Sequence, residues 1–203
     1  HQMVLQRHEC EHSRVNRCPP ARVRGRVVPA FQRAHTWLTN ASPRVNAYLR
    51  APHSSSNQTV ADALWNHFAW DENVRTQQLT YPDIPRMVKR VIDTLIPVVP
   101  RSANDVHAFC PARSVQLRDA RETVANSPGG WRHTNCYEFF APFFEPDRGL
   151  PSRAKTAVHE MSHSWADTGD EHYEWEEAYH TMGIRDSANN ADSYAALVRD
   201  LGT

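Results

Sequence analysis

The sequence predicts an α+β fold in which most of the chain is helical and a small antiparallel sheet is inserted. Before residue 104 and after residue 150, apolar residues recur every three or four positions, which places them on one face of a helix. Between residues 104 and 144, short segments rich in valine and aromatic residues alternate with turn residues, a pattern typical of strands. A chain of 203 residues with 40% hydrophobic content is long enough for one compact domain.

Residues 1–28 are predicted to form an irregular basic arm, and residues 29–203 a single domain. The arm shows no sustained periodicity and contains the pair Pro19-Pro20. Six arginines lie within the first 26 residues, although the formal net charge of the whole chain is zero. A basic arm can bind nucleic acid, but no aromatic residue is interleaved here for base stacking. We therefore interpret the arm as a solvated tail and expect no nucleic-acid partner.

Three helices are predicted in the first half of the chain. The first begins at Pro29 and is interrupted between Asn40 and Pro43. The second follows the polar residues 54–57, the last of which can cap it. Its apolar stripe comprises Val60, Leu64, Trp65 and Phe68. The third, residues 84–95, carries the cleanest amphipathic stripe of the chain.

Four segments between residues 104 and 144 are predicted to be strands of the antiparallel sheet. They read "DVHAFC", "SVQLR", "ETVAN" and "NCYEFF". After a loop, Ser152 is a candidate cap for the next helix. A last helix is expected from about Ala188 to Leu201.

The four cysteines indicate two structural disulfides in a secreted protein. No Cys-x-x-Cys spacing is present, which disfavours a zinc ribbon or a thioredoxin-type site. The expected pairing is Cys10 with Cys18 and Cys110 with Cys136, because each pair closes a short loop. Free buried thiols are the alternative.

The sequence also bears on location. No apolar run approaches the roughly 20 residues of a membrane-spanning helix, so a membrane-embedded protein is not expected. The chain opens on the polar residues His1-Gln2-Met3, so a signal peptide has either been removed or never existed.

The motif with the clearest chemistry is His159-Glu160-x-x-His163, the minimal signature of a zinc peptidase helix. Residues four apart lie on one helix face, so both imidazoles can ligate one ion. Glu160 then lies beside the ion without ligating it, where it can accept a proton from zinc-activated water. Neither proline nor glycine occurs between residues 154 and 165, which supports a helix here.

A catalytic zinc site needs a third protein ligand and an open position. A metzincin-type third histidine would fall at position 169, which is Gly169, so that class is excluded. Asp167 is only four residues after His163 and would stay on the helix if the helix continues that far. Gly169 lets the chain turn and Asp170 follows directly, which makes Asp170 the better-placed ligand. The other candidates are Glu171, His172, Glu174, Glu176 and Glu177.

The segments "HEMSH" and "TGDEHY" resemble the deuterolysin, or aspzincin, family of secreted zinc metalloendopeptidases, which includes a lysine-specific branch. That family pairs His-Glu-x-x-His with a downstream Gly-Thr-x-Asp-x-x-Tyr. Three flanking segments agree with it: "CYEFFAPFF", "SRAKTAVHEMSH" and "NNADSYAALV". The chain departs from the family pattern in having Thr168-Gly169 in reversed order and a shorter interval between His163 and Asp170. The resemblance covers roughly residues 106–198 and implies a zincin-like fold.

The resemblance also implies roles for individual residues. The Zn²⁺ ligands that it implies are His159, His163 and Asp170. Glu160 would be the general base, and Tyr173 would donate a hydrogen bond to the oxyanion. Asp192 would support the site or line the pocket for the substrate side chain. Lysine-specific members carry an acidic residue three places further on, where this chain has Ala195, so lysine specificity is not carried over.

The sequence thus predicts a secreted, monomeric, zinc-dependent endopeptidase that acts on protein or peptide substrates. Two alternatives stay open. The first is a gluzincin-like peptidase that uses a downstream glutamate as its third ligand. The second is a zincin-fold binding protein or effector without proteolytic activity, which the shortened third-ligand segment suggests.

Overall fold

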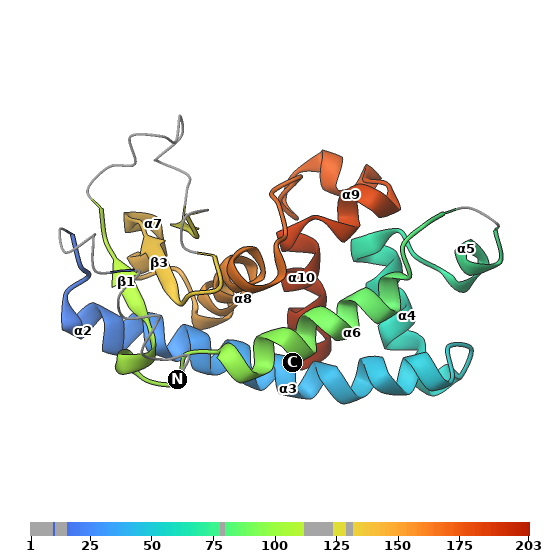
Figure 1. Cartoon of the computed structure of the whole chain (residues 1–203), viewed down its shortest axis with the longest axis horizontal. Helices are drawn as coiled ribbons and strands as arrows, with labels where there is room; N and C mark the ends of the chain where they lie inside the picture. The colour runs from blue at the N-terminus through green and yellow to red at the C-terminus, as the bar shows by residue number, and fades with distance from the viewer. Residues whose placement is uncertain (1–9, 11–15, 78–79, 112–123, 129–131) are drawn as a thin grey trace.

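The computed structural model describes residue 10 and residues 16–77, 80–111, 124–128 and 132–203. The predicted strand "SVQLR" and the start of "ETVAN" lie outside these ranges. The predicted α+β class, mostly helical with a small sheet, agrees with the described structure (Figure 1). None of the described helices is both long and apolar enough to cross a membrane.

A long helical segment at the N-terminal side begins at Pro20, so the prediction of an irregular arm is wrong for residues 20–28. Helix α2 (Pro20–Arg22), a π-helical turn (Val23–Val27) and α3 (Val28–Arg50) follow one another without a break. The Pro19-Pro20 pair starts this segment. Proline is tolerated in the first turn of a helix, because backbone N–H groups there make no hydrogen bond within the helix. Val23 and Val27 are buried in the main core, which ties the segment to the domain.

The predicted interruption near Pro43 is also wrong, since α3 continues through this proline. Ala41 and Val45, on either side of Pro43, are completely buried, as is Leu38 one turn earlier. Burial of this face stabilises the helix by more than the loss of one backbone hydrogen bond costs. Figure 1 shows α3 along most of the length of the molecule, with the sheet over one end and α4 over the other.

The next two predicted helices are present as α4 (Gln58–Phe68) and α6 (Ile84–Leu95), with one exception in the apolar stripe of α4. The short helix α5 (Glu72–Thr76) between them was not predicted. The predicted bounds of α6 are confirmed, and the side chain of Asp83 caps its first turn. The exception is Trp65, which is 57% exposed, whereas Leu64 beside it is buried. One residue turns a helix by about 100°, so position 65 leaves the buried face formed by positions 60, 64 and 68. Short 3₁₀ turns occur at Ser55–Asn57, Ile96–Val98, Ala103–Asp105 and Glu177–Thr181.

The sheet has mixed strand directions, so the prediction of an antiparallel sheet is corrected. Its strands are β1 (His107–Phe109), β2 (Ala125–Asn126) and β3 (Cys136–Phe139), in the order β1-β3-β2. The central strand β3 pairs parallel to β1 and antiparallel to β2. Tyr137 and Phe139 of β3 lie against Phe31 of α3, which joins the sheet to the helical core.

The disulfides join Cys10 to Cys136 and Cys18 to Cys110, so the predicted pairing is wrong. The segment before α2 runs along β1. The amide of Cys18 donates to the carbonyl of Ala108 at 3.0 Å, and the backbones of Arg17 and Phe109 form an isolated antiparallel β-bridge. This contact between segments remote in sequence, and not the length of the loop, decides which cysteines meet.

The C-terminal third contains the remaining helices. They are α7 (Ala141–Phe144), α8 (Leu150–Ala166), α9 (Ile184–Ala188) and α10 (Ala191–Gly202). Helix α8 starts after Gly149, so Ser152 lies inside it and does not cap it. The predicted last helix, from about Ala188 to Leu201, corresponds to α10, whereas the short helix α9 before it was not predicted. Both α8 and α10 pack on α3, and they pack on each other.

Candidate metal centre

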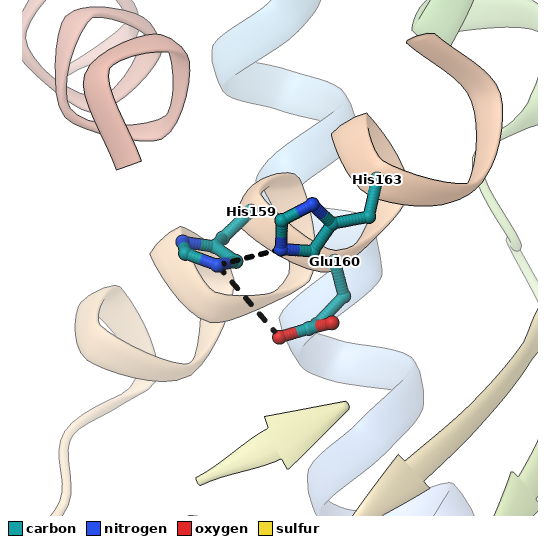
Figure 2. Close-up of side chains that lie close together, drawn as sticks. All are labelled: His159, Glu160 and His163. Carbon is teal, nitrogen blue, oxygen red and sulfur yellow. Dashed lines mark hydrogen bonds and ion pairs between the residues drawn. The ribbon is translucent and has the colours of Figure 1, made fainter. Parts of the chain in front are cut away.

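Helix α8 presents the histidine pair from a rigid position. Ala157, Val158 and Met161 on its inner face are completely buried in the core. His159 and Glu160 are each 5% exposed, and the Nε2 atoms of His159 and His163 lie 3.0 Å apart. Figure 2 shows the three motif side chains converging from successive turns of the helix. Ligand atoms of His159, Glu160 and His163 all lie within 4.8 Å of one another.

The helix ends at Asp167, and this end turns Asp167 away from the histidines. Asp167 has a left-handed backbone conformation, with φ 55°, and the amides of residues 167 and 168 both donate to the carbonyl of Ser162. The carboxylate of Asp167 is half exposed and pairs with Arg132 at 3.3 Å. The chain therefore reverses at Asp167 and not, as the sequence suggested, at Gly169.

Gly169 instead allows the backbone to lie close to the segment of Asn189 to Ala191. Its amide donates to the carbonyl of Asn189 at 2.6 Å, and its carbonyl accepts from the amide of Ala191 at 2.9 Å. A Cβ atom at position 169 would lie 2.8 Å from the side-chain nitrogen of Asn189. This bridge holds the segment after α8 against the start of α10.

The bridge brings Asp170 to both histidines. Its Oδ1 atom lies 2.8 Å from Nε2 of His159 and 3.0 Å from Nε2 of His163. The short interval between His163 and Asp170 is thus long enough for the chain to fold back.

Hydrogen bonds on the far side of each imidazole fix the ring orientation. Nδ1 of His163 lies 2.7 Å from the carbonyl oxygen of Thr168, which can only accept, so this nitrogen carries the proton. Nδ1 of His159 lies 2.9 Å from Oδ1 of Asp192. In the neutral rings, both Nε2 atoms therefore turn lone pairs toward the carboxylate of Asp170. Three acceptors that face one another need a proton or a metal ion between them.

The electrostatics of the cluster favour cations. Burial on its own lowers the pKa of His159, but the hydrogen bonds with Asp170 and Asp192 outweigh burial and raise this pKa to about 10. Burial on its own raises the pKa of Asp170, but hydrogen bonds from both histidines hold it well below its ordinary value. A divalent ion would have to displace protons from this cluster.

The donor set fits zinc. Two histidines and one carboxylate are one of the ligand sets that catalytic zinc sites use. Tetrahedral zinc with bonds of about 2.0–2.2 Å separates its ligand atoms by roughly 3.3 Å. The observed separations of 2.8–3.0 Å between Asp170 and the two histidines come close to this value.

Glu160 lies beside these three atoms but is not one of them. Its carboxylate approaches Nε2 of His159 only to 4.0 Å. Its Oε2 atom is buried and has no hydrogen-bond partner among the described residues. Burial raises the pKa of Glu160 above its ordinary value. A buried carboxylate oxygen without a partner is costly, so this atom is available to a group bound at the site.

Tyr173 and Asp192 both contact His159. The ring of Tyr173 stacks on the imidazole with a centroid distance of 5.7 Å and an interplanar angle of 9°. Asp192 accepts from His159 with Oδ1, while Oδ2 accepts from Lys155 and from the amide of Glu174. Both carboxylate oxygens of Asp192 are engaged inside the protein, which favours support of the site over direct contact with a substrate.

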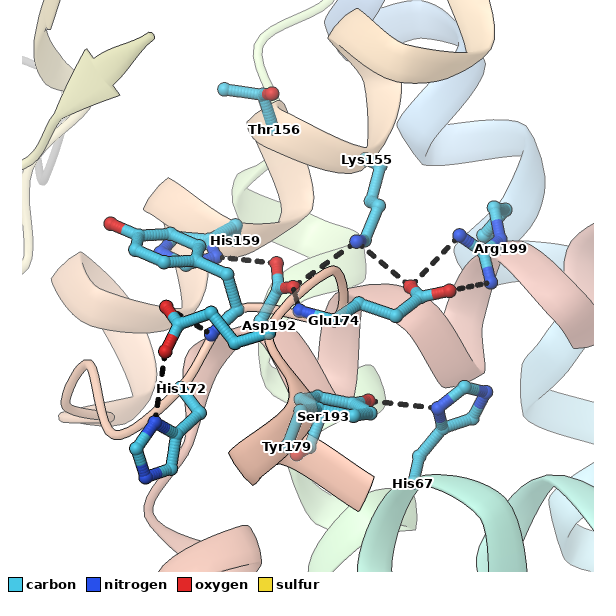
Figure 3. Close-up of polar contacts among 12 residues, drawn as sticks. His67, Lys155, Thr156, His159, His172, Glu174, Tyr179, Asp192, Ser193 and Arg199 are labelled. Carbon is cyan, nitrogen blue, oxygen red and sulfur yellow. Dashed lines mark hydrogen bonds and ion pairs between the residues drawn. The ribbon is translucent and has the colours of Figure 1, made fainter. Parts of the chain in front are cut away.

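Sequence reasoning missed an ion-pair chain that backs the site (Figure 3). Lys155 bridges Asp192 at 3.1 Å and Glu174 at 2.8 Å, and Glu174 receives two hydrogen bonds of 2.9 Å from Arg199. The position of Lys155 one helical turn before His159 was a signal that could have found it. Glu174, which the sequence offered as a candidate metal ligand, instead forms ion pairs with Lys155 and Arg199. Glu176, another candidate, lies 3.0 Å from His172.

The site opens into a cavity of about 410 Å³. His159 and Glu160 form part of its wall, together with Tyr173, Trp175 and the β2 segment at Ala125. A buried and a partly buried imidazole that meet one carboxylate beside a cavity can bind a metal ion and present it to a ligand.

The described structure has a mostly helical fold with a small mixed sheet, and this fold is similar to that of a zinc peptidase of known structure. Among solved structures, the chain is similar to a zinc peptidase from Grifola frondosa, with a TM-score of 0.62. The two are 16% identical, over 90% of this chain and 96% of that chain, so the likeness establishes the fold. No protein-family model and no curated protein matches the chain.

Proposed function

We propose that this protein is a secreted zinc-dependent endopeptidase of the deuterolysin type. The observation that carries the proposal is the convergence of Asp170 on His159 and His163. His159 of this cluster and the buried Glu160 line the adjoining cavity. The likeness to a zinc peptidase fold and the two disulfides support it.

In this proposal His159, His163 and Asp170 hold Zn²⁺. When bound, the ion supplies Lewis acidity that lowers the pKa of water to about 7 and polarises a peptide carbonyl. Glu160 accepts the proton of the attacking water on its partnerless oxygen and passes it to the leaving amine. Tyr173 donates its hydroxyl proton in a hydrogen bond to the oxyanion. Asp192 positions the imidazole of His159.

The substrates would be proteins or peptides, and the enzyme would act as a monomer. Two of the downstream glutamates give the gluzincin-like alternative no support, because Glu174 pairs with Lys155 and Arg199 and Glu176 pairs with His172.

Replacement of Glu160 tests the proposal. Glu160→Gln keeps the shape of the side chain but removes its basicity, so zinc content should be unchanged while cleavage of denatured casein is lost. The control is Glu145→Gln, at an exposed position, which should cleave like the wild type. Full activity of pure Glu160→Gln would overturn the mechanism. A zinc-loaded wild type that cleaves neither casein nor a peptide library would favour the non-proteolytic binding protein.

A further inference from the structure

Two aromatic side chains continue outward from the candidate metal centre. Tyr173 stacks on His159, and Trp175 stacks in turn on Tyr173 with a centroid distance of 5.8 Å and an interplanar angle of 5°. Trp175 is 75% exposed, more than any other large hydrophobic side chain of the described residues. We call Tyr173 and Trp175 the aromatic ledge. The rings of Trp175 and Tyr173 are parallel and offset, and the high exposure of Trp175 shows that most of its surface is open to solvent.

The backbone of the ledge is anchored on both sides of Trp175. Before it, the amide of Glu174 donates to Asp192 at 2.6 Å, and the Glu174 carboxylate pairs with Lys155 and Arg199 (Figure 3). After it, Glu176 accepts a hydrogen bond from the amide of Tyr173 at 3.2 Å. An exposed tryptophan on an anchored loop is pre-ordered, so a ligand that covers it does not have to order the loop as well.

The ledge and the candidate catalytic residues line the same cavity, which also includes His159 and Glu160. A group bound on Trp175 therefore lies beside the position where a peptide bond would be cleaved.

The charged side chains of the cavity wall, apart from one oxygen of Glu160, already have ion-pair or hydrogen-bond partners within the protein. Lys155 and Asp192 pair with each other, and Glu176 pairs with His172. Arg148 donates to the carbonyl of Pro142 and to the hydroxyl of Ser152. Among the described lining residues, Glu160 has the one buried oxygen without a partner, and the proposed mechanism uses it. A basic substrate side chain would have to break an existing pair of Asp192 or Glu176, whereas an apolar one needs only the open aromatic surface.

We propose that the aromatic ledge is a binding subsite for a bulky apolar side chain, aromatic or aliphatic, of the peptide substrate next to the cleaved bond. This inference rests on the proposed peptidase function. Burial of the open face of Trp175 supplies the binding free energy, because tryptophan offers a large rigid apolar surface at low entropic cost.

Binding to an inactive variant tests the ledge separately from catalysis. The probes are blocked peptides of alanine, glycine and glutamine with a single central Phe, Leu, Lys or Ala, so that only the Lys peptide carries a charge. Their affinities are measured by calorimetry on zinc-loaded Glu160→Gln. The Phe and Leu peptides should bind about tenfold more tightly than the Ala peptide.

Three second substitutions, each added to Glu160→Gln, identify the tryptophan. Trp175→Ala should abolish the preference for Phe and Leu, and Trp175→Phe should retain most of it. Trp65→Ala removes a similarly exposed tryptophan from α4, outside the cavity lining, and should change nothing.

Equal affinity for the Phe and Ala peptides, a preference for Lys, or a Phe preference that survives Trp175→Ala would overturn the inference. None of these results would bear on the role of Glu160 in cleavage. Conversely, loss of the Phe preference in Trp175→Ala supports the ledge even if the wild type proves unable to cleave casein.

Discussion

Asp192, at the start of α10, lies 2.9 Å from Nδ1 of His159, which comes 33 residues earlier on α8. This hydrogen bond determines that Nε2, on the opposite edge of the ring, faces Asp170 and His163. The lysine of the ion-pair chain and the backbone of Glu174 hold the second oxygen of Asp192. The orientation of one candidate metal ligand thus depends on three separate segments.

We expect Asp192→Asn to weaken zinc binding by about 10- to 100-fold, because the neutral amide orients and polarises the imidazole less well. Zinc affinity is measured by competition with a chromophoric chelator. Asp186→Asn, at an exposed position of α9, is the control and should bind zinc like the wild type. Equal affinities of the two variants would show that Asp192 does not support the site.

The third ligand is tested by a matched pair of aspartates. Asp170→Asn should lower zinc affinity by about 100-fold or more, since it removes a charged ligand. Asp167→Asn should leave zinc affinity nearly unchanged, because that carboxylate faces Arg132. Zinc content after dialysis against a weak chelator distinguishes them. Normal zinc content in Asp170→Asn would instead favour a downstream glutamate as ligand.

Disulfide mapping checks the corrected pairing. Proteolysis without reduction should yield one fragment that joins Cys10 to Cys136 and another that joins Cys18 to Cys110. The double substitution of Cys18 and Cys110 by serine should lower the free energy of unfolding in urea by about 2–5 kcal/mol, because the bridge spans 92 residues. A fragment that joins Cys10 to Cys18 would contradict the structure.

Replacement by alanine should change the free energy of unfolding in opposite directions at two glycines, Gly202 and Gly25. A methyl group at Gly202 would overlap the backbone and Cβ of Trp37, where α10 crosses α3, whereas at Gly25 it would meet nothing within 4 Å. Gly202→Ala should therefore lower the free energy of unfolding by about 1–3 kcal/mol. Gly25→Ala lies in a helical segment and should raise it by about 0.5–1 kcal/mol. Urea denaturation of both variants measures the difference, and equal effects would contradict the close approach of α10 to α3.

The partly buried carboxylate of Glu72, away from the candidate metal centre, predicts that stability depends on pH. Burial on its own raises the pKa of Glu72, but hydrogen bonds from Arg75 and Tyr48 outweigh it and hold the pKa below its ordinary value. A carboxylate with a lowered folded-state pKa stabilises the fold above its unfolded-state pKa and loses that effect as pH falls through the folded value. The stability advantage of the wild type over Glu72→Gln should be full at pH 7 and shrink at acid pH. Denaturation of both proteins across this range tests the sign, and an advantage that grows with acidity would contradict it.

Sequence by itself determined the features that depend on neighbours a few residues apart. The apolar stripe of residues 84–95 and its capping Asp83 were enough for α6. The four-residue interval of His159 and His163 was enough to place both imidazoles on one helix face. Such features follow from the period of the helix, which is a property of the local backbone.

Tertiary structure alone decided the features that depend on which distant segments meet. Packing on the core carries α3 through Pro43, and the segment before α2 lies on β1, which selects the cysteine pairs. The bridge between Gly169 and Asn190 brings Asp170 to the histidines. These contacts join residues that are up to 126 positions apart in sequence. Burial of the shared core brings such segments together, and no local pattern in either segment records its partner.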